Sequence, residues 1–135
     1  MPRISPAKSV TAAETKDYFA KAEEFLAAAE ESLGLDRHTA ATSLAVRAGI
    51  NAADAITGAR EGLRAAGSDH AQALPLLKRA GRDGVEAAAC LGRLLPLKTR
   101  AEYDPREVSK SDAVRAVSSA RQMVDIARRV IAPLG

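Results

Sequence analysis

Aromatic residues are scarce in this chain of 135 residues: their share is 3%, and tryptophan is absent. The hydrophobic share is nevertheless 47%, and much of it is alanine. Because alanine is the best helix former and is depleted in strands, this composition favours helices. No stretch keeps the alternation of apolar and polar residues that is typical of strands. We therefore expect an all-α protein with a core of small side chains.

Cysteine and histidine are almost absent as well. Cys90 is the only cysteine, so no disulfide can form within the chain, and its apolar neighbours predict a small buried side chain. His38 and His70 are the only histidines, and neither has a spacing typical of a metal site. The glycines stand singly, without the pattern of a phosphate-binding loop. We expect neither a metal nor another cofactor.

Long apolar runs are also missing. No run of about 18 apolar residues occurs, so we expect no membrane span. The N-terminus lacks the apolar segment of a signal peptide, and we expect a cytoplasmic protein. The net charge is +3, and residues 68–135 carry 12 Lys and Arg against 8 Asp and Glu, while residues 1–67 carry 8 against 9. Such a basic second half permits binding of nucleic acid or nucleotides but does not establish it.

Helix start and stop signals predict an antiparallel bundle of four to five helices. We expect residues 1–9 to fray and residues 10–135 to form a single domain. Thr11 and Glu14 have the spacing of a capping box, and the helix that they begin is expected to end at Gly34. The other helices are expected from about 36–39 to Gly67, over 70–80 and 83–95 after a Ser68–Asp69 cap, and from the Ser109 cap to about Ile131. Pro96 is expected to end the third helix, which leaves residues 96–108 as a loop.

Two groups of polar residues are candidates for a binding site. Arg47, Asn51 and Asp54 are spaced by four and three residues, so they share one face of the second helix. That stripe is either a solvated or structurally paired surface or a face toward a ligand or partner. A basic group around the expected loop could instead meet an anionic partner; it consists of Lys78, Arg79, Arg82, Arg93, Lys98, Arg100 and Arg106. Its alternative is scattered surface charge.

The expected loop carries a distinctive run. Lys98, Arg100, Glu102, Tyr103 and Asp104 lie together there, followed by Pro105. Arg100 with this run, Val108–Ser109 and an Ala/Val-rich helix over 113–130 resembles the HEPN superfamily. The resemblance covers roughly residues 10–132 and implies a helical bundle.

The resemblance also implies a chemistry. Catalytic HEPN proteins form dimers in which an arginine holds a phosphate and a histidine transfers protons, and they cleave RNA without a metal. The histidine is expected after four to six intervening residues that follow the arginine. Here those positions are Pro105, Arg106 and Glu107, and no histidine follows His70. The chain therefore resembles a divergent member that lacks the motif histidine.

Three hypotheses stay open. The first is a non-catalytic homodimer that binds RNA, a nucleotide or a partner protein near Arg100, as a component of a toxin–antitoxin pair with a nucleotidyltransferase. The second is a metal-independent RNase toxin in which Tyr103 or Glu102 replaces the histidine, although an ordinary tyrosine is a poor base at neutral pH. The third is a helical adaptor with no nucleic-acid role. Steep weakening of binding by salt would separate the first from the third.

Overall fold

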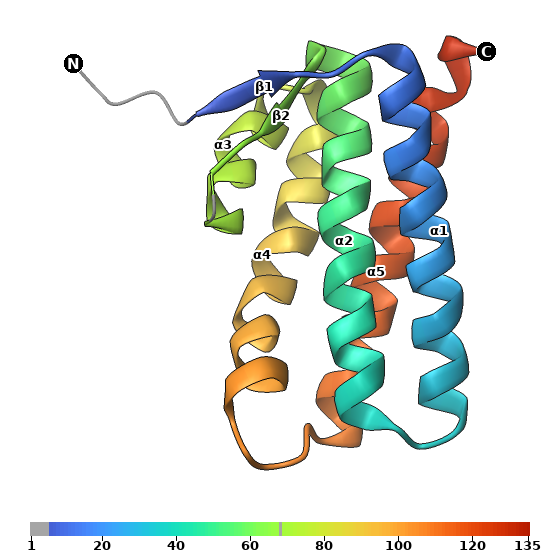
Figure 1. Cartoon of the computed structure of the whole chain (residues 1–135), viewed down its shortest axis with the longest axis vertical. Helices are drawn as coiled ribbons and strands as arrows, with labels where there is room; N and C mark the ends of the chain where they lie inside the picture. Colours follow the sequence, from blue (N-terminus) through green and yellow to red (C-terminus); the bar gives the residue numbers. More distant parts are fainter. Residues whose placement is uncertain (1–5, 68) are drawn as a thin grey trace.

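The computed structural model describes residues 6–67 and 69–135. In this part of the chain, four long helices run antiparallel to their neighbours in sequence and form a bundle (Figure 1). They are α1 (Ala12–Gly34), α2 (His38–Glu61), α4 (Gly81–Tyr103) and α5 (Lys110–Ile131), and the short α3 (Ala73–Lys78) lies beside α4. The predicted all-α bundle is confirmed.

Local signals place the first and last helices as expected. Thr11 Oγ1 accepts from the backbone N–H of Glu14, and Glu14 Oε1 accepts from the N–H of Thr11, both at 3.0 Å. This reciprocal pair is the predicted capping box. Ser109 Oγ accepts from the N–H of Asp112 at 3.1 Å and caps α5. Each cap satisfies an amide that the first helical turn leaves without a partner.

Two predicted boundaries were wrong. Helix α2 ends at Glu61 instead of Gly67, because Gly62 adopts a left-handed conformation with φ 66° and closes the helix there. Helix α4 passes through Pro96 and continues to Tyr103, so the expected loop over 96–108 is much shorter. A proline inside a helix removes one N–H and its ring crowds the preceding turn, but side chains on both sides of Pro96 still pack on the core.

The segment before α1 differs from the prediction as well. Ala7–Ser9, which was expected to fray, forms strand β1 and pairs antiparallel with β2 (Leu63–Ala65). Residues 1–5 lie outside the described residues. The chain turns at Gly62, whose carbonyl accepts from Val10 N–H at 2.9 Å, and this turn aligns the two short strands. Short 3₁₀ turns at His70–Gln72 and Ala132–Leu134 complete the described elements.

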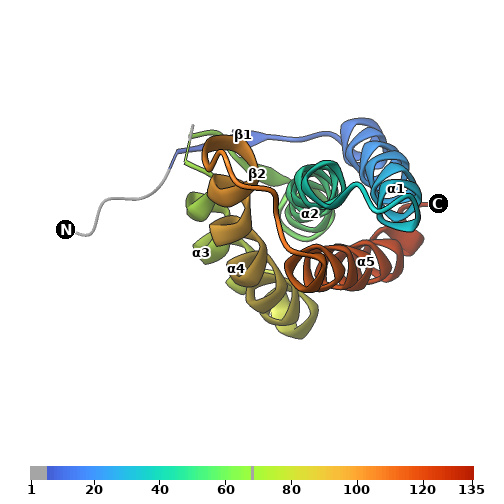
Figure 2. The ribbon, with the colours of Figure 1, turned by 90° about the horizontal axis from the view of Figure 1, so that it is seen from below.

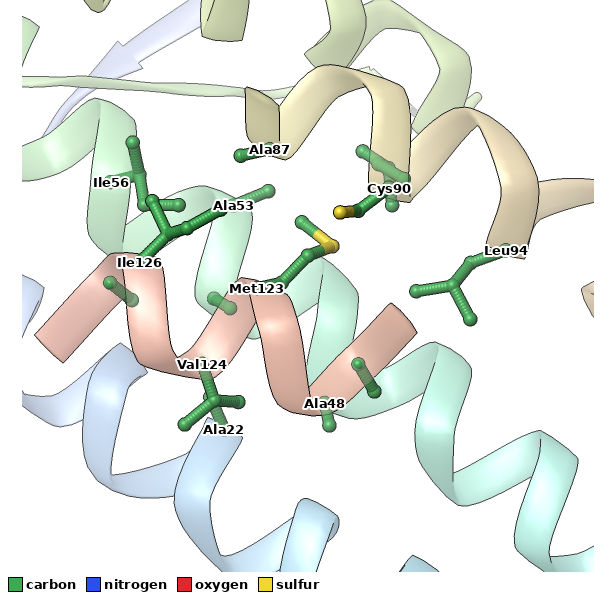
Figure 3. Packing of buried hydrophobic residues seen from close by; sticks show 14 of the residues in the cluster. Ala22, Ala48, Ala53, Ile56, Ala87, Cys90, Leu94, Met123, Val124 and Ile126 are labelled. Carbon is green, nitrogen blue, oxygen red and sulfur yellow. The ribbon is translucent and has the colours of Figure 1, made fainter. Parts of the chain in front are cut away.

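Small side chains let α2 sit close to α4 and α5 in the core. Figure 3 shows Ile56, Met123 and Leu94 packing among alanines from these helices. At Gly49 a side-chain carbon would lie 2.5 Å from Leu94 Cδ1, so the glycine permits the close approach. Cys90 is fully buried, as predicted, and burial raises the pKa of its thiol.

One end of the bundle brings together segments that are distant in sequence. The end of α4, the loop over 104–109 and the start of α5 lie beside the start of α2, as Figure 2 shows from below. Val108 is buried there, and its N–H donates to Thr39 Oγ1 on α2 at 3.0 Å. This bond fixes the loop that follows α4. None of the helices described is both long and apolar enough to cross a membrane.

Candidate functional site

The residues expected in a loop lie instead on the last turns of α4. Lys98 and Glu102 are one helical turn apart, and Lys98 Nζ lies 3.1 Å from Glu102 Oε2. Tyr103 is the last residue of the helix and its side chain is exposed. Because a helix now carries these residues, Arg100 projects from a rigid element toward the start of α5.

Asp112 joins two arginines from different helices. Arg100 Nη1 on α4 lies 2.5 Å from Asp112 Oδ2, and Arg115 Nη2 on α5 lies 2.6 Å from Asp112 Oδ1. The hydrogen bond from Arg115 and the charge of Arg100 lower the pKa of the Asp112 carboxyl. The carboxyl is therefore ionised at neutral pH and holds both guanidinium groups at the start of α5.

Two surface depressions adjoin at Asp112. One has a volume of about 460 Å³ and lies between α4 and α5, where Arg93, Pro96 and Arg115 contribute to its lining. The other has a volume of about 340 Å³ and lies over the loop, with Arg100 and Arg106 in its lining. Their charged lining residues are Arg93, Arg100, Arg106 and Arg115 against Asp104, Glu107 and Asp112. We call the four arginines together with Asp112 the arginine site.

The loop beside the arginine site is tied down by its own charges. Asp104 accepts from the backbone N–H of Arg106 at 2.9 Å, and Arg106 Nη2 donates to the second oxygen of Asp104 at 3.0 Å. These bonds lower the pKa of Asp104. They also hold the guanidinium group of Arg106 at the edge of the smaller depression.

His38 reaches the same end of the bundle, which the sequence did not indicate. Its Nδ1 lies 3.6 Å from Glu107 Oε1 in the loop, and its Nε2 lies 3.6 Å from Asp36 Oδ1. Only 17% of the side chain is exposed, and Nε2 is buried without a hydrogen bond from the residues described. The imidazole therefore lies next to the loop, and it does not line either depression.

The stripe on α2 lies apart from the arginine site. Arg47 is exposed, and Asn51 Nδ2 donates to the carbonyl of Arg47 at 2.9 Å, which is an ordinary contact within a helix. Asp54 lines a different, smaller depression of about 80 Å³ together with Arg64 and His70. Burial raises the pKa of Asp54 to about 6, although the nearby charge of Arg64 acts in the opposite direction.

The arrangement suits ligand binding by arginine and offers no metal centre. Across 6–67 and 69–135, no group of three or more His, Cys, Asp or Glu side chains is placed to hold a metal ion. Arg93, Arg106 and Arg100 belong to the basic group read from the sequence, and the structure brings them to adjoining depressions. Asp112 was predicted only as part of a helix start, and Arg115 was not singled out. The signal for their pairing was a spacing of three residues, which is too common to be informative.

These observations define a class of protein: an all-α bundle that carries arginines at the junction of its last two long helices. The family model for the HEPN domain matches residues 15–130, and the chain belongs to this family. The match spans almost all of α1, all of α2 and α4, and α5 up to Val130. No curated protein matches the chain. Membership indicates a role related to RNA or nucleotides.

Proposed function

We propose that this HEPN protein binds RNA without cleaving it, through contacts between the arginine site and RNA phosphates. The observation that carries the proposal is the convergence of Arg93, Arg100, Arg106 and Arg115 on two adjoining depressions. Guanidinium is always charged and offers a planar fork of donors that matches a phosphate group. Adjoining depressions with an arginine at each side suit successive phosphates of one strand.

The lack of an imidazole among the described residues that line the two depressions supports binding without cleavage. Metal-independent cleavage of RNA needs a group that transfers protons near neutral pH. The family position for the histidine holds Pro105, Arg106 and Glu107, and His38 is held beneath the loop between two carboxylates. Neither arrangement presents an imidazole to a phosphate at the arginine site.

A titration of single-stranded RNA tests the proposal. A short fluorescein-labelled RNA is titrated with the wild type and with Arg100→Gln at low salt, and binding is followed by fluorescence anisotropy. Removal of one charged hydrogen-bond donor is expected to weaken binding about tenfold, which corresponds to about 1.4 kcal/mol. Arg121→Gln is the matched control, because Arg121 is a surface arginine of α5 paired with Glu30 at 2.8 Å, outside the arginine site. It is expected to bind RNA like the wild type.

The same samples report on catalysis when they are run on a denaturing gel. We expect intact RNA after incubation with the wild type. Cleavage that disappears in Arg100→Gln would establish the RNase alternative instead. Absence of RNA binding at low salt would refute the proposed function and favour an adaptor role.

We also propose that the protein acts as a homodimer and that, as some HEPN proteins do, it pairs with a nucleotidyltransferase in a toxin–antitoxin system. The family match supports this proposal, because HEPN domains often dimerise. Analytical ultracentrifugation at micromolar concentration tests the first part, and a monomer there would refute it. Affinity purification of the protein from its native cells, with bound proteins identified by mass spectrometry, tests the second part, and a fraction without a nucleotidyltransferase would refute that pairing.

A further inference from the structure

Asp112 bridges two arginines of the arginine site. Its two oxygens accept from Arg100 at 2.5 Å and from Arg115 at 2.6 Å, so one carboxylate engages two guanidinium groups from two helices. A phosphate between the same arginines would use two of its oxygens in the same way. The carboxylate and a phosphate therefore compete for the same donors.

The exposure of these side chains shows how the competition is arranged. The Asp112 side chain is 13% exposed, whereas those of Arg100 and Arg115 are 58% and 71% exposed. The carboxylate thus lies at the base of the site, and the arginines extend past it toward solvent. A ligand that approaches from solvent can reach the guanidinium groups, but it meets donors that Asp112 already engages.

We infer that Asp112 competes with phosphate for Arg100 and Arg115 and so weakens the binding of phosphate groups at this pair of arginines. This inference rests on the proposed function. A single phosphodiester carries the same charge as the carboxylate that it must displace, so one phosphate gains little by entering. A strand with a further phosphate at Arg93 gains a contact that no carboxylate of the site opposes, whereas Arg106 is already paired with Asp104. The site therefore favours an RNA strand over an isolated phosphate.

A second bridging carboxylate, Asp83 at the start of α4, provides a matched control. Asp83 Oδ2 lies 3.0 Å from Arg60 Nη2, and Asp83 Oδ1 lies 3.2 Å from Arg129 Nη2. Hydrogen bonds from Arg129 and Arg60 lower the pKa of Asp83, as happens for Asp112 with its own two arginines. Asp83 stands 17 residues before Arg100 on α4, which separates the two sites by about 25 Å.

The test compares Asp112→Asn and Asp83→Asn with the wild type in the anisotropy titration described above. Asparagine keeps the shape of aspartate but removes the charge that competes with phosphate. We expect Asp112→Asn to bind RNA about tenfold more tightly than the wild type. Asp83→Asn is expected to bind like the wild type. Asp112→Glu keeps a competing carboxylate and is expected to stay near wild-type affinity.

Each outcome separates this inference from the proposed function. If the wild type binds RNA and Asp112→Asn binds equally or more weakly, Asp112 positions the arginines and the competition is refuted, while RNA binding stands. If neither protein binds RNA, the proposed function fails and the inference fails with it. Equal tightening by Asp83→Asn would show a general effect of net charge and would also refute the competition. Should Asp112→Asn fail to fold, Asp112→Ser carries the same expectation.

Discussion

Asp54 is a carboxyl group whose surroundings oppose its charge. It lies on α2 among buried alanines and lines the small depression next to Arg64 and His70. Burial raises its pKa from the ordinary value of 3.8 to about 6. The folded protein therefore holds the proton of Asp54 more tightly than the unfolded chain does, and this difference links stability to pH.

The direction and size of the effect follow from these two pKa values. Well below pH 3.8 Asp54 is protonated in both the folded and the unfolded protein, so its burial as a charge does not lower the free energy of unfolding. Between 3.8 and about 6 the unfolded chain releases the proton first, so the free energy of unfolding falls as pH rises. Above about 6 the full cost is present, and it corresponds to about 3 kcal/mol. We therefore expect Asp54→Asn to be more stable than the wild type at neutral pH by about 2 kcal/mol, because the buried amide retains part of the desolvation cost.

Urea denaturation of both proteins across this range provides the measurement. The difference in the free energy of unfolding is expected to be small near pH 4 and to reach its full size by about pH 7.5. Asp17→Asn, which removes an exposed carboxylate of α1, is the matched control and is expected to show no comparable trend. A difference between wild type and Asp54→Asn that stays constant with pH would show that burial does not raise this pKa.

Three further predictions concern helix α4. Gly84→Ala is expected to destabilise the protein by about 2 kcal/mol, because the added methyl group would collide with the backbone carbonyl of Leu77 and with Ala80. At Gly92 nothing lies within 4 Å of the added carbon, so Gly92→Ala is expected to stabilise by up to about 1 kcal/mol. Pro96→Ala is expected to stabilise by about 1–3 kcal/mol, since it restores an N–H that can bond to the carbonyl of Gly92. Thermal or urea unfolding measures all three changes, and an undiminished stability of Gly84→Ala or a destabilised Pro96→Ala would contradict the packing described.

The elements that the sequence predicted well depend on local signals. Thr11 with Glu14 and Ser109 with Asp112 each lie three residues apart, and such pairs determine a helix start on their own. The all-α fold likewise follows from a composition rich in alanine. These features could be read without any knowledge of tertiary contacts.

The helix and strand boundaries that were predicted wrongly depend on tertiary contacts, which local sequence signals do not reveal. Pro96 usually ends a helix, but Leu94 is fully buried and Leu95 and Leu97 pack on the core, so continuing the helix outweighs one missing hydrogen bond. Strand β1 exists because Gly62 turns the chain back toward residue 10. Strands of three residues have no periodic pattern that could reveal them.

The candidate site likewise combines a residue that the sequence indicates with residues that only the packing of the helices brings together. Arg100 could be selected from the run of residues around it, but its partner Asp112 follows only after the loop, on another helix. His38 and Glu107 meet across 69 positions of the chain, as do Thr39 and Val108, whose bond fixes the loop. Such pairings come from the way in which the helices pack, so sequence reasoning could propose the arginine but not its surroundings.

Binding of RNA phosphates by the arginine site is best tested through its dependence on salt. We predict that the logarithm of the affinity falls linearly with the logarithm of the salt concentration, because each arginine that neutralises a phosphate releases a counterion from the RNA. Replacing Arg100 and Arg115 together by glutamine is expected to weaken binding and to reduce the slope by about 0.7 for each phosphate that is no longer neutralised. An affinity that does not depend on salt, or a slope that the double substitution leaves unchanged, would contradict the proposed role of these arginines.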